Sequence, residues 1–378
     1  MWISLHARAA MVLLAASVLT AQESPLSTGS FNVNLGKDAP VALVGISVGD
    51  SHTSARGAAL VIDLHTALLT LRNTSSNRIH GIALRVLSQE VTLGGKGSVS
   101  IPSLDIGPGE VFPVPIDMQL MRPSSVIGGP LVEVSLDGVI FQNLSFYGLD
   151  RLNSRRTLTA WEMEARRDRD HYRQILSQAG PEGLRQAMLE AMARRPQLDV
   201  RVERGPAVTS AALASERTER FAFLEFPDSP IKPVEGWAQI AGNQARAPSI
   251  QVLNRSAKPV KYVELGWLVR DQNGQQYLAA SLPGSDPNLS LPAGKTTRLE
   301  QETTLRFTRE GKPVNVESTA GFVSRVQFAD GQLWVPSRQD LENAALARTL
   351  PPSLEEQNLA AIYAKKGLEG LIQELKRH

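Results

Sequence analysis

The sequence predicts a mainly β protein in which two β-sandwiches are joined by a helical hairpin and followed by a helical C-terminal tail. The first observation is a repeat. Residues 69–86 and 250–267 align without a gap, and Asn73 falls on Asn254 (254 − 73 = 181). The second is a series of short Val-, Ile- and Leu-rich segments separated by turn residues, which is typical of sandwiches. The third is a change to helical apolar spacing in residues 157–195 and 338–378.

The composition fits a globular chain of two domains. The 378 residues are long for one domain, and 42% hydrophobic with 21% charged residues is ordinary for globular proteins. The 40 basic and 38 acidic residues leave a net charge of +2, which argues against a nucleic-acid-binding surface. Aromatic residues make up only 5%, few for stacking against sugars or bases. The sequence has no cysteine, so we expect both domains to depend on packing without disulfides.

Residues 1–21 have the pattern of a signal peptide that is removed on export. Arg8 supplies positive charge, residues 9–19 form an apolar stretch too short to span a bilayer comfortably, and Ala21 is suited to cleavage. The alternative is an uncleaved N-terminal anchor. No later segment reaches transmembrane length. We therefore expect a bacterial protein, periplasmic or extracellular, whose mature chain has no transmembrane segment.

Residues 22–150 should form the first sandwich. Asp137-Gly138 is interpreted as a hairpin turn, because both residues accept positive φ. Asp330-Gly331 repeats this pattern in the second half. In the alignment of the two copies Trp334 then corresponds to Phe141, so both aromatic side chains are expected in a core. The expected strands of the first sandwich are 41–48, 58–73, 79–88, 111–120, 131–136 and 139–146.

Residues 151–197 should form a helical linker of two helices. Thr159 and Glu162 make a capping-box pattern at its start. Gly180-Pro181 stops one helix and starts the next, and Pro196 ends the hairpin.

Residues 198–337 should form the second sandwich, and residues 338–378 the helical tail. In the tail, Ser353 and Glu356 form another capping box, and Gly367 is typical of a helix C-terminus. The expected strands of the second sandwich are 220–226, 234–240, 249–254, 260–271, 296–307, 321–328 and 333–335.

A family resemblance rests on the repeated half. The second copy contains Asn254-x-Ser256, an alternating strand, Asp271-x-x-Gly274 and then Pro292-Ala293-Gly294. This pattern resembles the FxLYD-type immunoglobulin-like modules of exported bacterial proteins. The first copy keeps Asn73-x-Ser75 but lacks the Asp-x-x-Gly. The resemblance covers about fifty residues of each copy and implies two immunoglobulin-like β-sandwiches, with no catalytic residues to carry over.

One motif points to catalysis. Gly45-Ile46-Ser47-Val48-Gly49 matches the G-x-S-x-G nucleophile elbow of α/β-hydrolases, where a strand turns sharply into a helix. No helix-period segment follows Gly49. If Asp50-Ser51 is aligned with Asp228-Ser229 of the second copy, Ser47 corresponds to Glu225, which lies in an ordinary strand pattern. We therefore interpret Ser47 as a surface strand residue. A serine hydrolase remains the alternative, with its acid and base drawn from the nearby Asp50, His52, Asp63 and His65.

The other motifs predict no catalytic, cofactor or metal site. The six histidines lack metal-ligand spacing, and Asp63 with His65 supplies only two ligands on one strand face. Gly94-Gly95-Lys96-Gly97 lacks P-loop spacing, and we expect a hairpin loop there. We expect four Asn-x-Ser/Thr sequences to be turns rather than glycosylation sites: Asn73, Asn143, Asn254 and Asn288.

Two helical patterns could serve as docking surfaces, although packing is the simpler interpretation. Residues 166–171 alternate in charge, which predicts a solvated helix face with weak ion pairs; an acidic-partner site is the alternative. The apolar stripes of residues 184–192 and 368–375 predict packing against a neighbour. Docking of another protein is the alternative for the terminal helix.

These observations favour a non-enzymatic exported structural or protein-interaction protein of the bacterial envelope, with no cofactor and no metal. Its expected partner is another envelope or extracellular protein, because sandwiches offer edges and loops for recognition. Two alternatives stay open: a serine hydrolase using Ser47, and a carbohydrate- or small-ligand-binding protein.

Overall fold

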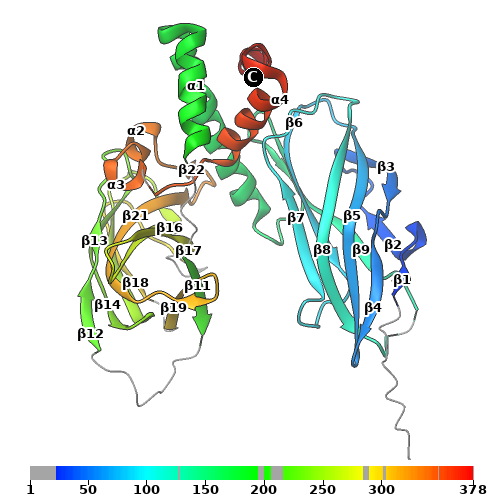
Figure 1. Cartoon of the computed structure of the whole chain (residues 1–378), viewed down its shortest axis with the longest axis horizontal. Coiled ribbons are helices and arrows are strands. Elements are labelled where there is room, and N and C mark those ends of the chain that lie inside the picture. The colour runs from blue at the N-terminus through cyan, green and yellow to red at the C-terminus, as the bar shows by residue number, and fades with distance from the viewer. Residues whose placement is uncertain are drawn as a thin grey trace, which may run out of the picture. The chain divides into compact units, whose positions relative to one another are not determined.

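The computed structural model describes residues 23–126, 128–194, 200–205, 216–283, 289–300, 304–347 and 349–377. The chain is mainly β, with a long helix between two β halves and a helical C-terminus, as the sequence predicts (Figure 1). It divides into two compact units. One contains the described residues up to Ser75 with Leu84–Val99 and Pro108–Leu136, and the other contains Ser76–Ala83, Ser100–Gly107 and the chain from Asp137 onward.

The first β half forms two sheets. One has the order β1-β4-β5-β3, with β8 also on β5; the other has the order β10-β9-β6-β7, with β2 parallel to β9. The strands are β1 (Ser24–Pro25), β2 (Phe31–Asn34), β3 (Val41–Ser47), β4 (His52–Arg56), β5 (Ala59–Asn73), β6 (Ile79–Leu87), β7 (Lys96–Ile101), β8 (Val111–Pro123), β9 (Val132–Phe141) and β10 (Phe146–Tyr147).

Alternation along the strands decides which side chains form the core. On β8, Phe112, Val114 and Ile116 are buried, whereas Pro113 and Pro115 between them are exposed. Successive side chains of a strand point to opposite faces, so this segment buries one apolar face and leaves the other to solvent.

The predicted hairpin at Asp137-Gly138 is wrong, because β9 runs straight through both residues. The Asp137 carboxylate is buried and accepts hydrogen bonds from the backbone N–H groups of Arg151 and Leu152 and from the Ser154 hydroxyl. A Cβ on Gly138 would lie 2.3 Å from the Phe146 ring. The chain therefore does not turn at this Asp-Gly. Asp137 instead binds the segment that leads into the following helix, and Gly138 leaves room for the Phe146 ring.

The second β half repeats this topology with additional strands. Its sheets have the orders β11-β19-β15-β14-β12 and β13-β21-β16-β17, with β18 on β15, β20 on β19 and β22 on β21. The strands are β11 (Arg201–Gly205), β12 (Arg217–Arg220), β13 (Ala222–Phe223), β14 (Ile231–Ala241), β15 (Gln244–Asn254), β16 (Val260–Asp271), β17 (Gln276–Pro283), β18 (Thr296–Glu300), β19 (Thr304–Arg309), β20 (Lys312–Pro313), β21 (Val316–Phe328) and β22 (Leu333–Trp334). Apolar side chains of both sheets share one core, including Val252 of β15 and Val263 of β16.

The predicted repeat of the turn at Asn73 and Asn254 is confirmed. Both side chains are fully buried, and each Oδ1 accepts hydrogen bonds from the N–H and hydroxyl of the serine two residues later, Ser75 or Ser256. These asparagines are therefore structural turn residues, as expected.

The structural alignment of the two copies differs from the predicted one before and after the matched segment. Val41 pairs with Asn73 as Ile231 pairs with Asn254, and each strand shifts register at the equivalent valine, Val44 or Val234. Ser47, three residues beyond Val44, is therefore equivalent to Trp237, and its predicted alignment with Glu225 is wrong.

The aromatic alignment is also wrong. The hairpin bond from Phe141 N–H to Ser145 O matches that from Phe328 N–H to Gln332 O, so Phe141 is equivalent to Phe328 rather than to Trp334.

The central helix α1 (Ser154–Ala193) is broken as predicted at Gly180, which has φ 68° and ψ −171°, with Pro181 opening the second segment. Its start is earlier than expected. The proposed capping pair Thr159 and Glu162 lies inside the helix, so that prediction is wrong. Pro196 lies outside the described residues.

The C-terminal region contains α2 (Arg338–Leu341), α3 (Ala344–Ala347) and α4 (Leu354–Arg377). The predicted capping box of α4 is confirmed, with both reciprocal bonds between Ser353 and Glu356 at 3.0 Å. Gly367 breaks α4 with φ 69° and ψ −169°, close to the angles of Gly180. No described helix is both long enough and apolar enough to cross a membrane.

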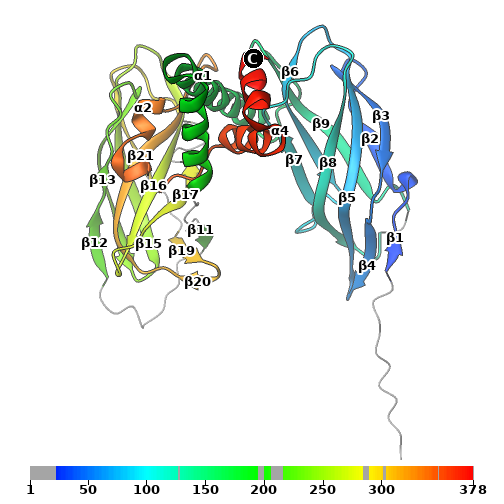
Figure 2. The same cartoon turned by 45° about the horizontal axis from the view of Figure 1, so that its top comes forward.

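Helices α1 and α4 lie side by side and share an apolar core (Figures 1 and 2). Its six buried members form three pairs separated by the same 187 residues: Tyr172 and Leu359, Leu184 and Leu371, Met188 and Leu375. The bends carry the same motif at that spacing, Gly-x-Glu-Gly-Leu-x-Gln, from Gly180 and from Gly367. The duplication therefore includes the bent helices, which the sequence analysis did not detect.

Candidate functional site

The G-x-S-x-G motif at Ser47 does not form a strand-to-helix elbow, and Ser47 is a surface strand residue, as interpreted from the sequence. Ser47 ends β3, pairs with Leu68 of β5 and is exposed, and the turn that follows at Gly49 leads into β4. His65 Nδ1 lies 3.6 Å from Asp117 Oδ2, and His52 Nδ1 lies 3.2 Å from the Asp50 carbonyl. Both imidazoles therefore contact groups other than the Ser47 hydroxyl.

The other motifs occupy structural positions. Asp63 lies opposite His52 in the β4–β5 pair, and the described residues contain no group of three or more ligating side chains that could hold a metal. Gly94 and Gly95 lie in the loop between β6 and β7, where Gly95 O accepts from Ser88 N–H, as expected of a hairpin loop. Asn143 makes an Asx turn with Ser145. Residues 1–21 and Asn288 lie outside the described residues.

The prediction of a solvated charge run at residues 166–171 is wrong. Asp168 is 0% exposed and Arg169 3% exposed. Arg169 bonds Glu162 Oε1 and Glu355 Oε1, both at 3.1 Å. Buried charges require partners, and here α1 itself supplies one and a later segment of the chain supplies the other. The pattern on α1 alone cannot reveal a partner almost two hundred residues away.

Beside this charge cluster lies an open cleft of about 500 Å³. It is lined by α1, β16, β17, β21 and the segment from Pro336 to Gln357, all within one compact unit. The apolar lining is larger than the polar one and includes Trp161, Leu278 and Phe322. A Cβ on Gly266 would lie 2.3 Å from the Phe322 ring, so the glycine is what allows this ring to lie against β16.

One wall of the cleft is organised by Glu356. Its Oε1 lies 2.6 Å from Arg194 Nη2, 2.9 Å from Arg338 Nη1 and 3.2 Å from the Tyr172 hydroxyl. Burial alone would raise the pKa of this carboxyl, but the Ser353 N–H and the two guanidinium groups lower the pKa to about 2. Glu356 is therefore an anion at neutral pH, and its contacts tie α1, α2 and α4 together.

The same wall carries a second ion pair. Arg167 holds the buried Asp168 through two contacts, at 2.9 and 3.1 Å, and donates to the Pro336 carbonyl at 3.1 Å. Such a fork fixes both side chains and ties α1 to the segment after β22.

Another part of the lining is organised by Arg325 of β21. Its Nη2 lies 3.5 Å from Glu164 Oε1 and its Nη1 lies 3.5 Å from Glu264 Oε2, which also accepts a 2.8 Å hydrogen bond from the Tyr262 hydroxyl. Burial raises the pKa of Glu164 above its usual value, and the positive charge of Arg325 opposes that shift. Arg325 therefore pairs with two carboxylates at once, one on α1 and one on β16.

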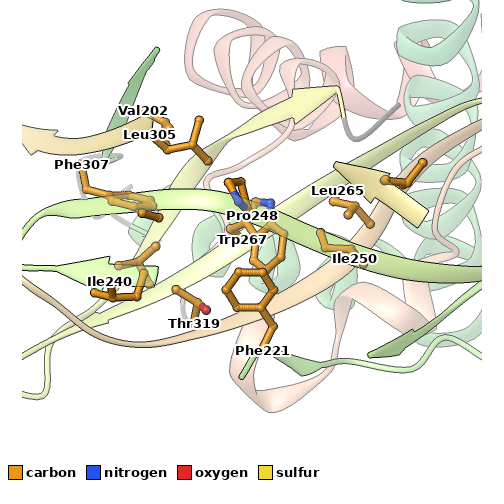
Figure 3. Close-up of a pocket in the computed structure, with 13 residues that line it drawn as sticks. Val202, Phe221, Ile240, Pro248, Ile250, Leu265, Trp267, Leu305, Phe307 and Thr319 are labelled. Atoms are coloured by element: carbon orange, nitrogen blue, oxygen red, sulfur yellow. The ribbon is translucent and has the colours of Figure 1, made fainter. Parts of the chain in front are cut away.

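A separate cavity of about 50 Å³ lies inside the second sandwich (Figure 3). Side chains of both sheets surround it, including Phe221, Ile240, Trp267 and Phe307, and Thr319 contributes a hydroxyl. This volume exceeds that of a single water but is far below the several hundred Å³ of ligand pockets. It is a gap in core packing.

Comparison with known proteins assigns no family. No model of a protein family matches the sequence, and no curated protein matches it. One similar solved structure is a Se-Met labelled beta-glucosidase from Kluyveromyces marxianus, with 10% identity and a TM-score of 0.15. The match covers 71% of this chain and 45% of the glucosidase chain, so the chain spans about half the length of that neighbour. At this TM-score the match carries no argument about fold or function.

The cleft was not predicted from the sequence, because its residues come from five distant segments. Of its lining, Ser353 and Glu356 were predicted as a helix cap, and Arg167 was part of the charge run at residues 166–171. The sequence signal for the cleft is the large number of acidic and basic residues on α1. A helix that also buries an apolar stripe brings some of these charges into the interior, where they need partners from elsewhere in the chain.

Proposed function

We propose that this is a non-enzymatic, exported interaction protein of the bacterial envelope or exterior, and that the cleft receives a segment of its partner protein. The observation that carries the proposal is the state of the cleft's charges. The lining carboxylates of Glu164, Glu264, Glu342 and Glu356 each contact an arginine, so the walls are neutralised and pre-organised. Such a surface suits binding, because general acid–base catalysis needs a carboxyl aimed at substrate.

A polypeptide segment fits this cleft better than a sugar. Among the described residues of its lining, Trp161 and Phe322 are the only aromatic ones, few for stacking on sugar rings. Leucines and the pair Pro351-Pro352 add aliphatic surface beside the charged residues of the lining. An apolar floor with ordered polar groups at its margin is typical of sites that hold protein segments.

Export is supported by the N-terminal sequence. Arg8 followed by the apolar residues 9–19 and the small Ala21 is the pattern of a secretory signal, and the absence of cysteine is compatible with an oxidising compartment. The expected location is therefore the periplasm or the outside of the cell.

Filling the cleft tests the proposal. Ala347 on α3 is exposed and lines the cleft, so Ala347→Trp should occupy it without disturbing a core. Ala344 lies on the same helix, is equally exposed and is not part of the lining, so Ala344→Trp is the matched control. Tagged wild-type and variant proteins would be used to capture partners from the native envelope.

We expect one envelope protein to be retained by the wild type and by Ala344→Trp and lost with Ala347→Trp. Equal retention by all three proteins would remove the cleft as the recognition site. Labelling by a fluorophosphonate probe that disappears in Ser47→Ala would instead identify a serine hydrolase and contradict the non-enzymatic proposal.

A further inference from the structure

The strand β8 has a free edge in the first β half. In the part of the chain that the structure describes, β8 forms a ladder with β5 alone. Backbone N–H and C=O groups alternate in direction along a strand, so every second residue of β8 points its backbone groups away from β5. Met121 N–H bonds the Gly94 carbonyl at 2.8 Å, outside the β5 ladder. The odd-numbered residues are therefore the outward ones.

Only a short part of this edge can accept a new strand. Pro113 and Pro115 are odd-numbered and have no N–H, and Met121 N–H is already bonded. Prolines commonly protect sheet edges against added strands. The outward N–H and C=O groups of Asp117 and Gln119 lie between these blocked positions. Asp117 and Gln119 are both exposed residues.

The second β half contains a strand at the equivalent edge. Gln119 pairs with Asp63, and Arg306 pairs with Gln244, which is 181 residues after Asp63. Gln119 is thus equivalent to Arg306 of β19. In the second half, β11 forms an antiparallel ladder along that edge and pairs Glu203 with Arg306. The same fold therefore accepts an extended strand at this position when one is supplied.

We propose that the outer edge of β8 at Asp117 and Gln119 binds an extended segment of a partner polypeptide as an added β-strand, as β11 binds β19. This site is independent of the cleft, which belongs to the other compact unit.

The pairing in the second half defines the chemistry of the added segment. Val202 of β11 lies opposite Phe307 and packs against the core, and the equivalent of Phe307 is the buried Leu120. An apolar residue should therefore lie opposite Leu120, with polar residues on either side of it. Because Asp117 is exposed at this edge, a basic segment is favoured over an acidic one. Met118 lies against Gly97 of β7, and a methionine side chain repacks readily when a neighbour is added.

The test uses a fluorescein-labelled peptide with the sequence of residues 200–205, Val-Arg-Val-Glu-Arg-Gly, and the full-length chain. Gln119→Pro removes one outward N–H and leaves the β5 ladder intact, as the natural Pro113 and Pro115 do. Gln119→Val keeps the N–H and is the matched control. Fluorescence anisotropy measures binding, and circular dichroism verifies that both variants are folded.

We expect saturable binding to the wild type, a similar affinity for Gln119→Val, and an affinity at least about tenfold lower for Gln119→Pro, the loss expected for one strand hydrogen bond and its neighbour. A peptide with aspartate in place of Val202 should not bind. Absence of saturable binding, or equal binding to both variants, would overturn the proposal. Dimerisation of the wild-type chain that Gln119→Pro abolishes would assign the edge to a second copy and overturn the partner assignment.

Discussion

At the scale of single residues, Thr319 shows how one polar atom can destabilise a sandwich core. Its side chain is 6% exposed and borders the apolar cavity, and among the described residues its hydroxyl has no hydrogen-bond partner. Replacing an unsatisfied buried hydroxyl by a methyl group of similar size removes a desolvation cost. Thr319→Val should therefore raise the free energy of unfolding by about 1 kcal/mol in urea denaturation.

Thr53 provides the matched control for this substitution. It is also buried, but its hydroxyl donates to the Ser24 carbonyl at 3.3 Å. Thr53→Val should therefore lower the free energy of unfolding by about 1 kcal/mol. Equal destabilisation by both substitutions would mean that the Thr319 hydroxyl is satisfied in solution.

The carboxylate of Glu356 makes stability depend on pH. Its pKa falls from 4.5 in the unfolded chain to about 2 in the fold, so the unfolded state binds more protons between these values. Its contribution, about 3 kcal/mol, is fully present above pH 4.5 and is lost as pH falls towards 2. Urea denaturation at a series of pH values should show this loss in the wild type.

The variant Glu356→Gln isolates that contribution. It should be much less stable than the wild type at neutral pH, because Arg194 and Arg338 lose their shared anion, and the difference should shrink as pH falls from 4.5 to 2. Glu182→Gln is the control, since this exposed carboxylate pairs only with Arg185 on the helix surface. A constant difference across the pH range would contradict the depressed pKa.

Some local interactions were predictable from sequence, and the distant ones were not. The turn at Asn73 and Asn254 and the cap at Ser353 are made by residues two or three positions apart, and each was predicted correctly. The burial of Asp168 and Arg169 was not predicted, because their partners Arg338 and Glu355 lie far along the chain.

At the scale of elements, the two bends depend on glycine. Gly367 has φ 69° and ψ −169°, a combination that side-chain-bearing residues rarely adopt. An added Cβ would meet nothing within 4 Å, so the cost of substitution comes from the backbone alone. Gly367→Ala should lower the free energy of unfolding by about 1–3 kcal/mol in thermal or urea denaturation.

Gly45 of β3 is the control for this prediction. Its φ is not positive, and an added Cβ would again meet nothing within 4 Å, so Gly45→Ala should be close to neutral. If Gly367→Ala is equally neutral, the helix is not bent at this position in solution.

Element boundaries show why a turn motif can mislead. Asp137-Gly138 and Asp330-Gly331 have the same letters, but only the second is a turn, with Gly331 at φ 87°. The first lies in a strand because the buried Asp137 carboxylate binds the start of α1. Turn propensity is a local preference, and here a tertiary contact overrides it.

At the scale of the whole molecule, the chain repeats a sandwich followed by a bent helix. The repeat of the strands was visible in the sequence. The repeat of the helices was hidden because its spacing is 187 residues instead of 181 and because Pro351-Pro352 interrupts the second copy. For the terminal helix, the sequence allowed either packing within the chain or docking of another protein. In the structure it packs on α1. That packing places Arg338 and Glu356 on one wall of the cleft.

The central claim is that the cleft recognises a partner protein, and site-specific photo-crosslinking in the native envelope tests it most directly. A photoreactive residue would replace Ala347 or Leu354, both exposed and in the cleft lining, or Ala344 outside it. The account predicts one adduct of the same size from positions 347 and 354 and none from position 344. Adducts from position 344 alone, or identical adducts from all three positions, would contradict it.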